Sequence, residues 1–138
     1  MLSFKADLLP FPLLMKIASR NVNGIRAVLH KDFFSRVKTH NPDILCLQEV
    51  KAFVSQIPPE IRFYLPDYDI LRHAGTRAGY AGTAILYKKQ GDATSSFTIT
   101  EKKAEFTPAC FQEDGRMTQL NFRFNEQEFA LLNLYFPN

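Results

Sequence analysis

The spacing of apolar residues predicts one helix near the start of the chain, between two strands. Residues 16–21 are typical of a short strand, and the Asn-Gly pair at 23–24 is typical of a tight turn. Between residues 25 and 40, apolar side chains recur at helical intervals. The Asn-Pro pair at 41–42 should end this helix, because a residue before proline disfavours the helical region. Residues 43–48 form a continuous apolar run, which predicts a strand buried on both faces.

The rest of the chain favours strands. Residues 53–64 predict a loop and a short helix, and residues 75–82 predict a glycine-bearing loop. Five segments are typical of strands: 68–72, 83–88, 93–100, 117–124 and 128–135. Asn125-Glu126 is expected to form the hairpin turn between the last two. One early helix between two strands, followed by several strands, predicts an α/β fold with a mixed sheet and flanking helices.

Composition is that of a globular protein, with 46% apolar and 22% charged residues and with 13 Phe and 5 Tyr. Residues 1–14 are expected to be a disordered extension ahead of one domain, residues 15–138. Two prolines interrupt its apolar stretch and no convincing cleavage site follows, so an extension, or an upstream start codon before Met15, is favoured over a signal peptide. No apolar run reaches about 18 residues, so no membrane span is expected.

Net charge and cysteine content exclude few classes of function. The formal net charge of +3 permits a polyanionic partner without requiring one. Of the two cysteines, Cys46 and Cys110, the first lies in the apolar run and is interpreted as a core residue. No Cys/His spacing indicates zinc, and a reducing compartment is inferred.

Polar residues that follow the first and second predicted strands are the candidates for chemistry. Glu49 lies at the carboxyl end of the buried strand, where α/β proteins bind ligands, and a carboxylate there can hold Mg²⁺. Lys51 could hold this carboxylate or contact a phosphate. If the two strands are parallel neighbours, Asn21 and Glu49 share one edge of the sheet. A solvated Glu-Lys pair is the simpler interpretation of Glu49, and an Asx turn is the simpler one of Asn21.

Five sequence blocks, in order, resemble the exonuclease III and abasic-site endonuclease family of the endonuclease/exonuclease/phosphatase superfamily. Any one block is weak, but five in the family's order and spacing are specific. The blocks are KIASRNVNGIRA (16–27), PDILCLQEVK (42–51), GYAGTAILY (79–87), DGR (114–116) and LNLYFPN (132–138).

The resemblance implies a DNA-repair phosphodiesterase that uses Mg²⁺, with Mn²⁺ as a substitute. Such an enzyme cleaves double-stranded DNA 5′ to abasic sites and removes nucleotides from 3′ ends. It implies that Glu49 and Asn21 hold the metal and that Tyr135 joins them in catalysis at the scissile phosphate. Four residues are expected to face the DNA: Lys51, Arg77, Tyr80 and Arg116. For Tyr80 and Arg116, a surface aromatic and a structural turn residue are equally good interpretations. A cytoplasmic, nucleoid-associated location is expected.

Arg20 departs from the family pattern, which usually has tryptophan at this position. A buried charge there would cost several kcal/mol, unless the strand lies near a sheet edge where arginine can reach water. Without that escape, Arg20 would indicate a damaged copy. His30, His40 and His73 lie outside the family's catalytic blocks and are expected at the surface or at helix ends.

The family fold is a four-layer α/β sandwich of two similar halves, and we expect the chain to be the first half, truncated after a strand. The family's later Asp-x-Asn, Asp and Asp-His elements have no match, so the chain alone is expected to be inactive. Its uncovered sheet face is expected to promote self-association. Two other hypotheses stay open: a non-catalytic DNA-binding remnant, and another phosphoesterase of the same superfamily that acts on phospholipids, inositol phosphates or RNA.

Overall fold

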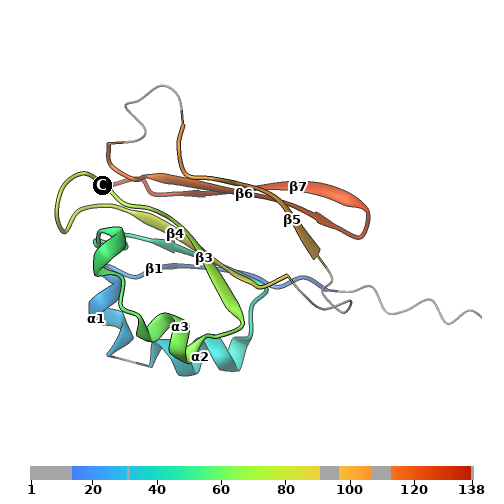
Figure 1. Ribbon diagram of the computed structural model, residues 1–138, viewed down its shortest axis with the longest axis horizontal. Coiled ribbons are helices and arrows are strands. Elements are labelled where there is room, and N and C mark those ends of the chain that lie inside the picture. The colour runs from blue at the N-terminus through green and yellow to red at the C-terminus, as the bar shows by residue number, and fades with distance from the viewer. Residues whose placement is uncertain (1–13, 31, 91–96, 107–112, 138) are drawn as a thin grey trace, which may run out of the picture.

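Two sheets and a layer of helices make up the computed structural model, which describes residues 14–30, 32–90, 97–106 and 113–137 (Figure 1). The first sheet has the strand order β1-β2-β4-β3 and the second β5-β6-β7. In chain order the elements are β1 (Ile17–Asn21), α1 (Ile25–Leu29), α2 (Phe33–His40), β2 (Ile44–Gln48), a 3₁₀ helix η1 (Val54–Gln56), α3 (Glu60–Tyr64), β3 (Tyr68–His73), β4 (Thr83–Lys88), β5 (Phe97–Lys103), β6 (Met117–Phe124) and β7 (Gln127–Leu134).

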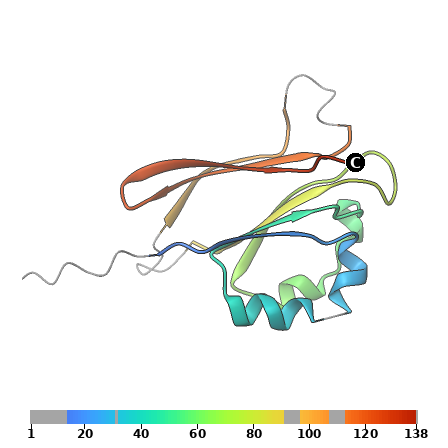
Figure 2. The same ribbon diagram turned by 180° about the vertical axis from the view of Figure 1, so that it is seen from behind.

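The first sheet lies in the middle of the molecule. Its helices cover one face and the second sheet covers the other, as both views show (Figures 1 and 2). β1 pairs with β2 in parallel, whereas β4 is antiparallel to both β2 and β3. The second sheet is antiparallel throughout. The predicted α/β fold with a mixed sheet and flanking helices is therefore confirmed.

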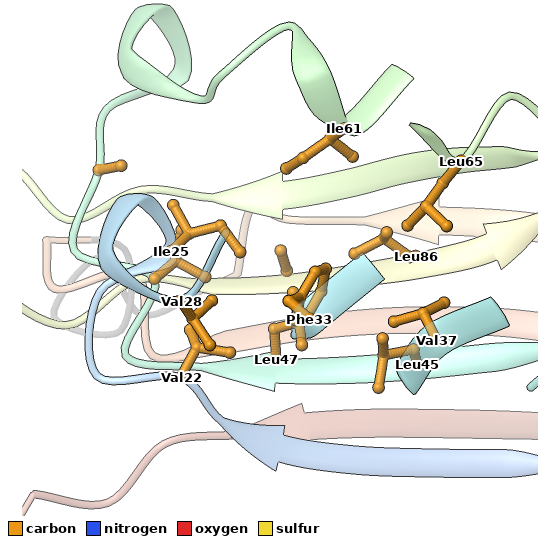
Figure 3. Packing of buried hydrophobic residues seen from close by; sticks show 13 residues of the cluster. Val22, Ile25, Val28, Phe33, Val37, Leu45, Leu47, Ile61, Leu65 and Leu86 are labelled. Atoms are coloured by element: carbon orange, nitrogen blue, oxygen red, sulfur yellow. The ribbon is translucent and has the colours of Figure 1, made fainter. Parts of the chain in front are cut away.

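The predicted burial of β2 on both faces is also confirmed. Leu45 and Leu47 join the core between the first sheet and the helices, which Figure 3 shows packed around Phe33. Ile44 and Cys46 face the second sheet instead. Side chains alternate in direction along a strand, so a continuous apolar run fills both cores at once. Burial raises the pKa of the Cys46 thiol to about 11, which keeps it protonated at neutral pH.

Two predicted elements have different bounds in the structure. The single helix predicted over 25–40 is wrong, because α1 ends at Leu29 and α2 starts at Phe33. Asp32 begins the second helix: its carbonyl accepts the Arg36 amide and its carboxylate pairs with the Arg36 guanidinium. The strand predicted over 93–100 is shifted to 97–103. Residues 91–96, Cys110 and the predicted extension up to residue 13 lie outside the described part.

Arg20 lies on an edge strand, which explains how a charged residue is tolerated at a position where the family usually has tryptophan. Among the described strands, β1 pairs with β2 alone, and Arg20 is half-buried beside α2. Its guanidinium is close enough to Asp32 to lower the pKa of that carboxyl, together with the larger effect of Arg36. The interpretation of Arg20 as an edge residue that reaches water is the one that fits this position. Among the described helices, none has the length and apolar character to span a membrane.

Candidate active site

Three loops meet at one end of the first sheet and form the site rim, residues 21–24, 49–51 and 81–82. β1 and β2 are parallel neighbours, so their carboxyl ends share this edge, as the sequence predicts. The loops are joined by backbone bonds: the Gly24 amide donates to the Glu49 carbonyl at 2.7 Å, and the Lys51 amide to the Ala81 carbonyl at 2.9 Å. These bonds hold the backbone positions from which the side chains of the site rim extend.

Glu49 is the centre of the site rim, because two neighbours hold its carboxylate from opposite sides. The Asn21 amide nitrogen donates to Glu49 Oε1 at 2.8 Å. Lys51 Nζ lies 2.9 Å from Glu49 Oε2 and also donates to Asn23 Oδ1 at 2.5 Å. Of the two roles predicted for Lys51, the structure shows that it holds the carboxylate. The side chains of Lys51 and Glu49 are 31% and 18% exposed, so water still reaches the pair.

Asn21 forms the Asx turn and also contacts Glu49, while its role at a metal stays a prediction. Its carbonyl oxygen accepts the Asn23 amide at 3.0 Å, which is an Asx turn, while its nitrogen faces Glu49. The turn orients the carboxamide toward the carboxylate. Hydrogen bonds from Asn21, then from Lys51, hold the pKa of the Glu49 carboxyl below its usual range, so this group is ionised at neutral pH.

Tyr135 approaches Glu49 from the second sheet. Its side chain lines the same cleft as Glu49, with the phenol close enough to the carboxylate for each group to affect the pKa of the other, and its backbone amide donates to the Arg116 carbonyl at 2.9 Å. Burial first, and the negative charge of Glu49 second, raise the pKa of the Tyr135 phenol. At neutral pH the phenol therefore keeps its proton and acts as a hydrogen-bond donor.

A cleft of about 430 Å³ opens at this end of the molecule. Residues from both sheets line it: Ser19, Asn21, Gln48, Glu49, Leu134, Tyr135 and Phe136. All three residues predicted to be catalytic are among them. Their catalytic and metal-binding roles stay predictions. The fold nevertheless brings Asn21 and Tyr135, which are far apart in the sequence, to the same cleft.

The remaining residues predicted to face DNA form a neighbouring cluster. The Arg77 guanidinium lies over the Tyr80 ring, 4.5 Å from its centre, and Arg116 donates to the Tyr80 hydroxyl at 3.3 Å. Arg116 also pairs with Asp114 at 2.6 Å, which offsets part of its charge. Arg77 is exposed, so it is the member of the cluster most open to a phosphate. Contact with DNA remains a prediction for all of them.

None of the three histidines lines the cleft that contains Glu49. His30 follows α1 and His40 ends α2, as expected. His73 differs from the expectation, because it ends strand β3, half-buried, with Nδ1 at 2.9 Å from the Met117 carbonyl oxygen. In the described part of the chain, no group of three or more His, Cys, Asp or Glu side chains is arranged to hold a metal ion.

Sequence reasoning missed three polar residues that support the site. Asn23 accepts from Lys51, and Gln48 donates to Asn133 at 2.6 Å beneath the cleft. Asn133 is only 2% exposed. The signal was present in the sequence: an asparagine interrupts an apolar strand at a position that the strand pattern assigns to the core.

Comparisons of the sequence with known proteins match it to nucleases of one family. A model described as "Endonuclease/Exonuclease/phosphatase family" matches residues 21–123. The chain is 33% identical over 127 residues to an "Exodeoxyribonuclease" of Bacillus subtilis (strain 168), matching 90% of this chain and 43% of that protein. It is 32% identical over 126 residues to "DNA repair nuclease APEX1" of Danio rerio, matching 90% of this chain and 36% of that protein. The chain thus spans less than half the length of these relatives.

Solved structures agree on the fold. An AP endonuclease from Archaeoglobus fulgidus superposes with a TM-score of 0.64 at 24% identity, over 88% of this chain and 41% of that one. The AP endonuclease LMAP from Leishmania major also gives 0.64, at 23% identity, over 88% and 40% of the two chains. At these identities the similarity concerns the fold alone.

Proposed function

Because the chain belongs to the endonuclease/exonuclease/phosphatase family, we propose that it carries part of the active site of a DNA-repair phosphodiesterase of the exonuclease III and abasic-site endonuclease type. Its substrate is double-stranded DNA, cut 5′ to abasic sites or shortened from 3′ ends. One observation carries the proposal: Asn21, Glu49 and Tyr135 line one cleft, and Lys51 pairs with the Glu49 carboxylate.

The donor atoms of the cleft fit a hard divalent cation. Glu49 offers an ionised carboxylate, and the Asn21 carbonyl oxygen keeps a second lone pair beside the one that accepts from Asn23. Mg²⁺ is commonly held by one or two carboxylates with water and substrate phosphates, so one carboxylate is sufficient for its protein side. Glu49 and Asn21 would hold the ion, and Mn²⁺ would suit the same oxygen donors. When bound, the ion supplies Lewis-acid stabilisation of negative charge on a phosphate oxygen.

The chain's own residues then bind and orient the phosphodiester. The protonated Tyr135 hydroxyl donates a hydrogen bond to a phosphate oxygen beside Glu49. Lys51 adds a positive charge at the same end of the cleft. Arg77, exposed over the ring of Tyr80, contacts the neighbouring DNA backbone. This arrangement positions charge where it develops during phosphoryl transfer.

Activation of water is the step that this cleft does not provide. Hydrolysis needs a general base near the attacking water. Among the described residues that line the cleft, Glu49 is the only carboxylate and there is no histidine, and the proposal assigns Glu49 to the metal. We therefore propose that the chain alone binds DNA without cutting it. The same observation favours the second candidate function, a non-catalytic DNA-binding protein.

Binding and incision of a labelled duplex test the proposal together. Fluorescence anisotropy would compare a duplex that carries one abasic-site analogue with an intact duplex, with Mg²⁺ and with chelator. We expect tighter binding of the abasic duplex with Mg²⁺ and loss of this preference in Glu49→Gln. Glu128→Gln, which removes an exposed carboxylate on β7, is the matched control and should behave as the unaltered chain.

Each result separates the candidates. Binding that ignores both Mg²⁺ and Glu49→Gln supports the non-catalytic DNA-binding protein. Absence of any salt-sensitive binding contradicts both candidates. Chelator-sensitive incision that disappears in Glu49→Gln would confirm the nuclease and show that the chain alone is active.

Self-association is a further expectation, carried by apolar side chains on the outer strand of the second sheet. Phe129, Leu132 and Leu134 of β7 are 42%, 50% and 39% exposed. Exposed apolar groups in one strand favour association in water. Light scattering should show dimers or larger species, and Leu132→Lys should shift the chain toward monomer. A monomer at all concentrations would contradict this expectation.

A further inference from the structure

Asn133 is a buried polar residue in the middle of the contact between the two sheets. It lies in β7, opposite Thr118 of β6, and both side chains are at most 2% exposed. A buried carboxamide is tolerated when its hydrogen-bonding groups are satisfied, so its partners reveal what the residue holds in place.

All of its partners except Thr118 lie on β2 and β4, the strands next to the site rim. The Asn133 nitrogen donates to the carbonyl oxygens of Leu47 at 3.0 Å and Ala84 at 2.9 Å, which belong to β2 and β4. It also lies 3.2 Å from Thr118 Oγ1. The Asn133 oxygen accepts from Gln48 Nε2 at 2.6 Å. One side chain of the second sheet is therefore bonded to two strands of the first.

Gln48 extends this connection to the edge strand. Its Nε2 also lies 3.0 Å from Ser19 Oγ on β1. Ser19, Gln48, Asn133 and Thr118 thus form a row of polar groups that crosses β1, β2, β7 and β6. Two of them, Ser19 and Gln48, line the cleft, so one end of the row forms part of the cleft wall.

Two members of this row are close in sequence to Glu49 and Tyr135, the site residues on the first and second sheets. Gln48 directly precedes Glu49, and Asn133 lies two residues before Tyr135. Most of the other contact between the sheets is apolar, through residues such as Cys46 and Leu120. Apolar contact is non-directional and tolerates sliding, whereas a hydrogen bond defines distance and direction.

We propose that Asn133 and Gln48 are positioning residues, whose hydrogen bond sets the spacing between Glu49 on the first sheet and Tyr135 on the second. Their value for phosphodiester cleavage rests on the proposed function. The competing view is that the bond only holds the sheets together. Positioning predicts that the Glu49–Tyr135 contact depends on the bond even where the fold survives.

The test uses solution NMR of the whole chain, without metal and without DNA. The readouts are the nuclear Overhauser contacts between the Tyr135 ring and the Glu49 side chain, and the carboxamide signals of Asn21. Gln48→Met removes the donor at similar side-chain length and leaves the Asn133 nitrogen with its three partners. Thr118→Val is the matched control, since it removes a buried hydroxyl bonded to Asn133 but not to Gln48. Thermal unfolding of each variant reports stability separately.

We expect Gln48→Met to lose the Tyr135–Glu49 contacts and to shift the Asn21 carboxamide signals, while Thr118→Val keeps both at a comparable loss of stability. Asn133→Leu should act like Gln48→Met, and if it does not fold, Gln48→Met decides the question. Unchanged contacts in a folded Gln48→Met would overturn the proposal and leave a purely structural bond. Because neither readout needs activity, an unaltered chain that fails to bind DNA would contradict the proposed function only.

Discussion

Replacing Arg20 by tryptophan is expected to stabilise the fold. Arg20 and Ala18 share the face of β1 that looks toward the helices, and a cleft of about 400 Å³ lies there between β1 and α2. Apolar side chains, among them Phe33 and Val37, supply much of its lining. An indole ring would cover this lining, whereas the arginine side chain must leave its charged end in water.

The magnitude follows from the area available. A tryptophan side chain buries roughly 150–250 Å² in a core, and an edge position offers about half of that, on the order of 100 Å². At about 25 cal/mol per Å² this burial contributes roughly 2.5 kcal/mol. The apolar stem of arginine already covers part of the area, and ordering the ring costs some entropy, so a net gain of about 1–2 kcal/mol remains. For a chain of this size the melting temperature should rise by roughly 3–8 °C.

The assay is urea unfolding followed by circular dichroism, with Arg20→Ala as the variant that removes the charge without filling the cleft. The chain has no tryptophan of its own, so the new residue also reports its environment by fluorescence. We expect blue-shifted emission in the folded state and stability above both the unaltered chain and Arg20→Ala. Emission typical of a solvated indole, or stability no higher than that of Arg20→Ala, would refute the reasoning.

Three further predictions concern single residues. Gly115→Ala should destabilise the chain by about 2–6 kcal/mol in urea unfolding, because a Cβ would lie 2.5 Å from the His73 carbonyl oxygen at a φ of +61°. Gly79→Ala, at φ +67° in open space, should cost only the backbone strain. Burial raises the pKa of Tyr68 to about 12 from 10.0, so the folded state keeps a proton that the unfolded chain loses. Stability should therefore fall as pH rises from about 10 to 12, less steeply in Tyr68→Phe. Cys46, with a pKa of about 11, should resist iodoacetamide at neutral pH until urea unfolds the chain, in a variant without the other cysteine.

Local patterns predicted most of the fold because they reflect local causes. The continuous apolar run of β2 could fill two cores only as a central strand, and it does. Asn125 and Glu126 have φ values of 47° and 64°, the conformation of a tight two-residue hairpin. The break between α1 and α2 was not predictable from apolar spacing, since helical spacing continues through it. It depends on the bonds that Asp32 makes, which the apolar pattern does not encode.

The part of the site that depends on the pairing of neighbouring strands could be predicted from the sequence. Parallel pairing of β1 with β2 brings Asn21 to Glu49, and this followed from an early helix between two strands. The arrival of Tyr135 did not follow from local patterns, because nothing in them states which strand ends meet across two packed sheets. Only the family resemblance placed Tyr135 in the site. Asn133 was identifiable as a polar residue in an apolar strand, but its partners depend on tertiary packing.

The backbone conformation of the loop around Glu49 fixes the position of its carboxylate in the absence of a ligand. Glu49 and Lys51 have φ values of 53° and 52°, in a region that costs non-glycine residues on the order of 1 kcal/mol or more each. Val50 between them is buried, at 3% exposure, and the two charged side chains pair with each other at 2.9 Å. The backbone bonds of the site rim offset the strain and prevent the loop from relaxing. A carboxylate fixed in this way would lose little freedom on binding the cation that the proposed function assigns to it, and such preorganisation is what an electrostatic site for phosphate chemistry requires.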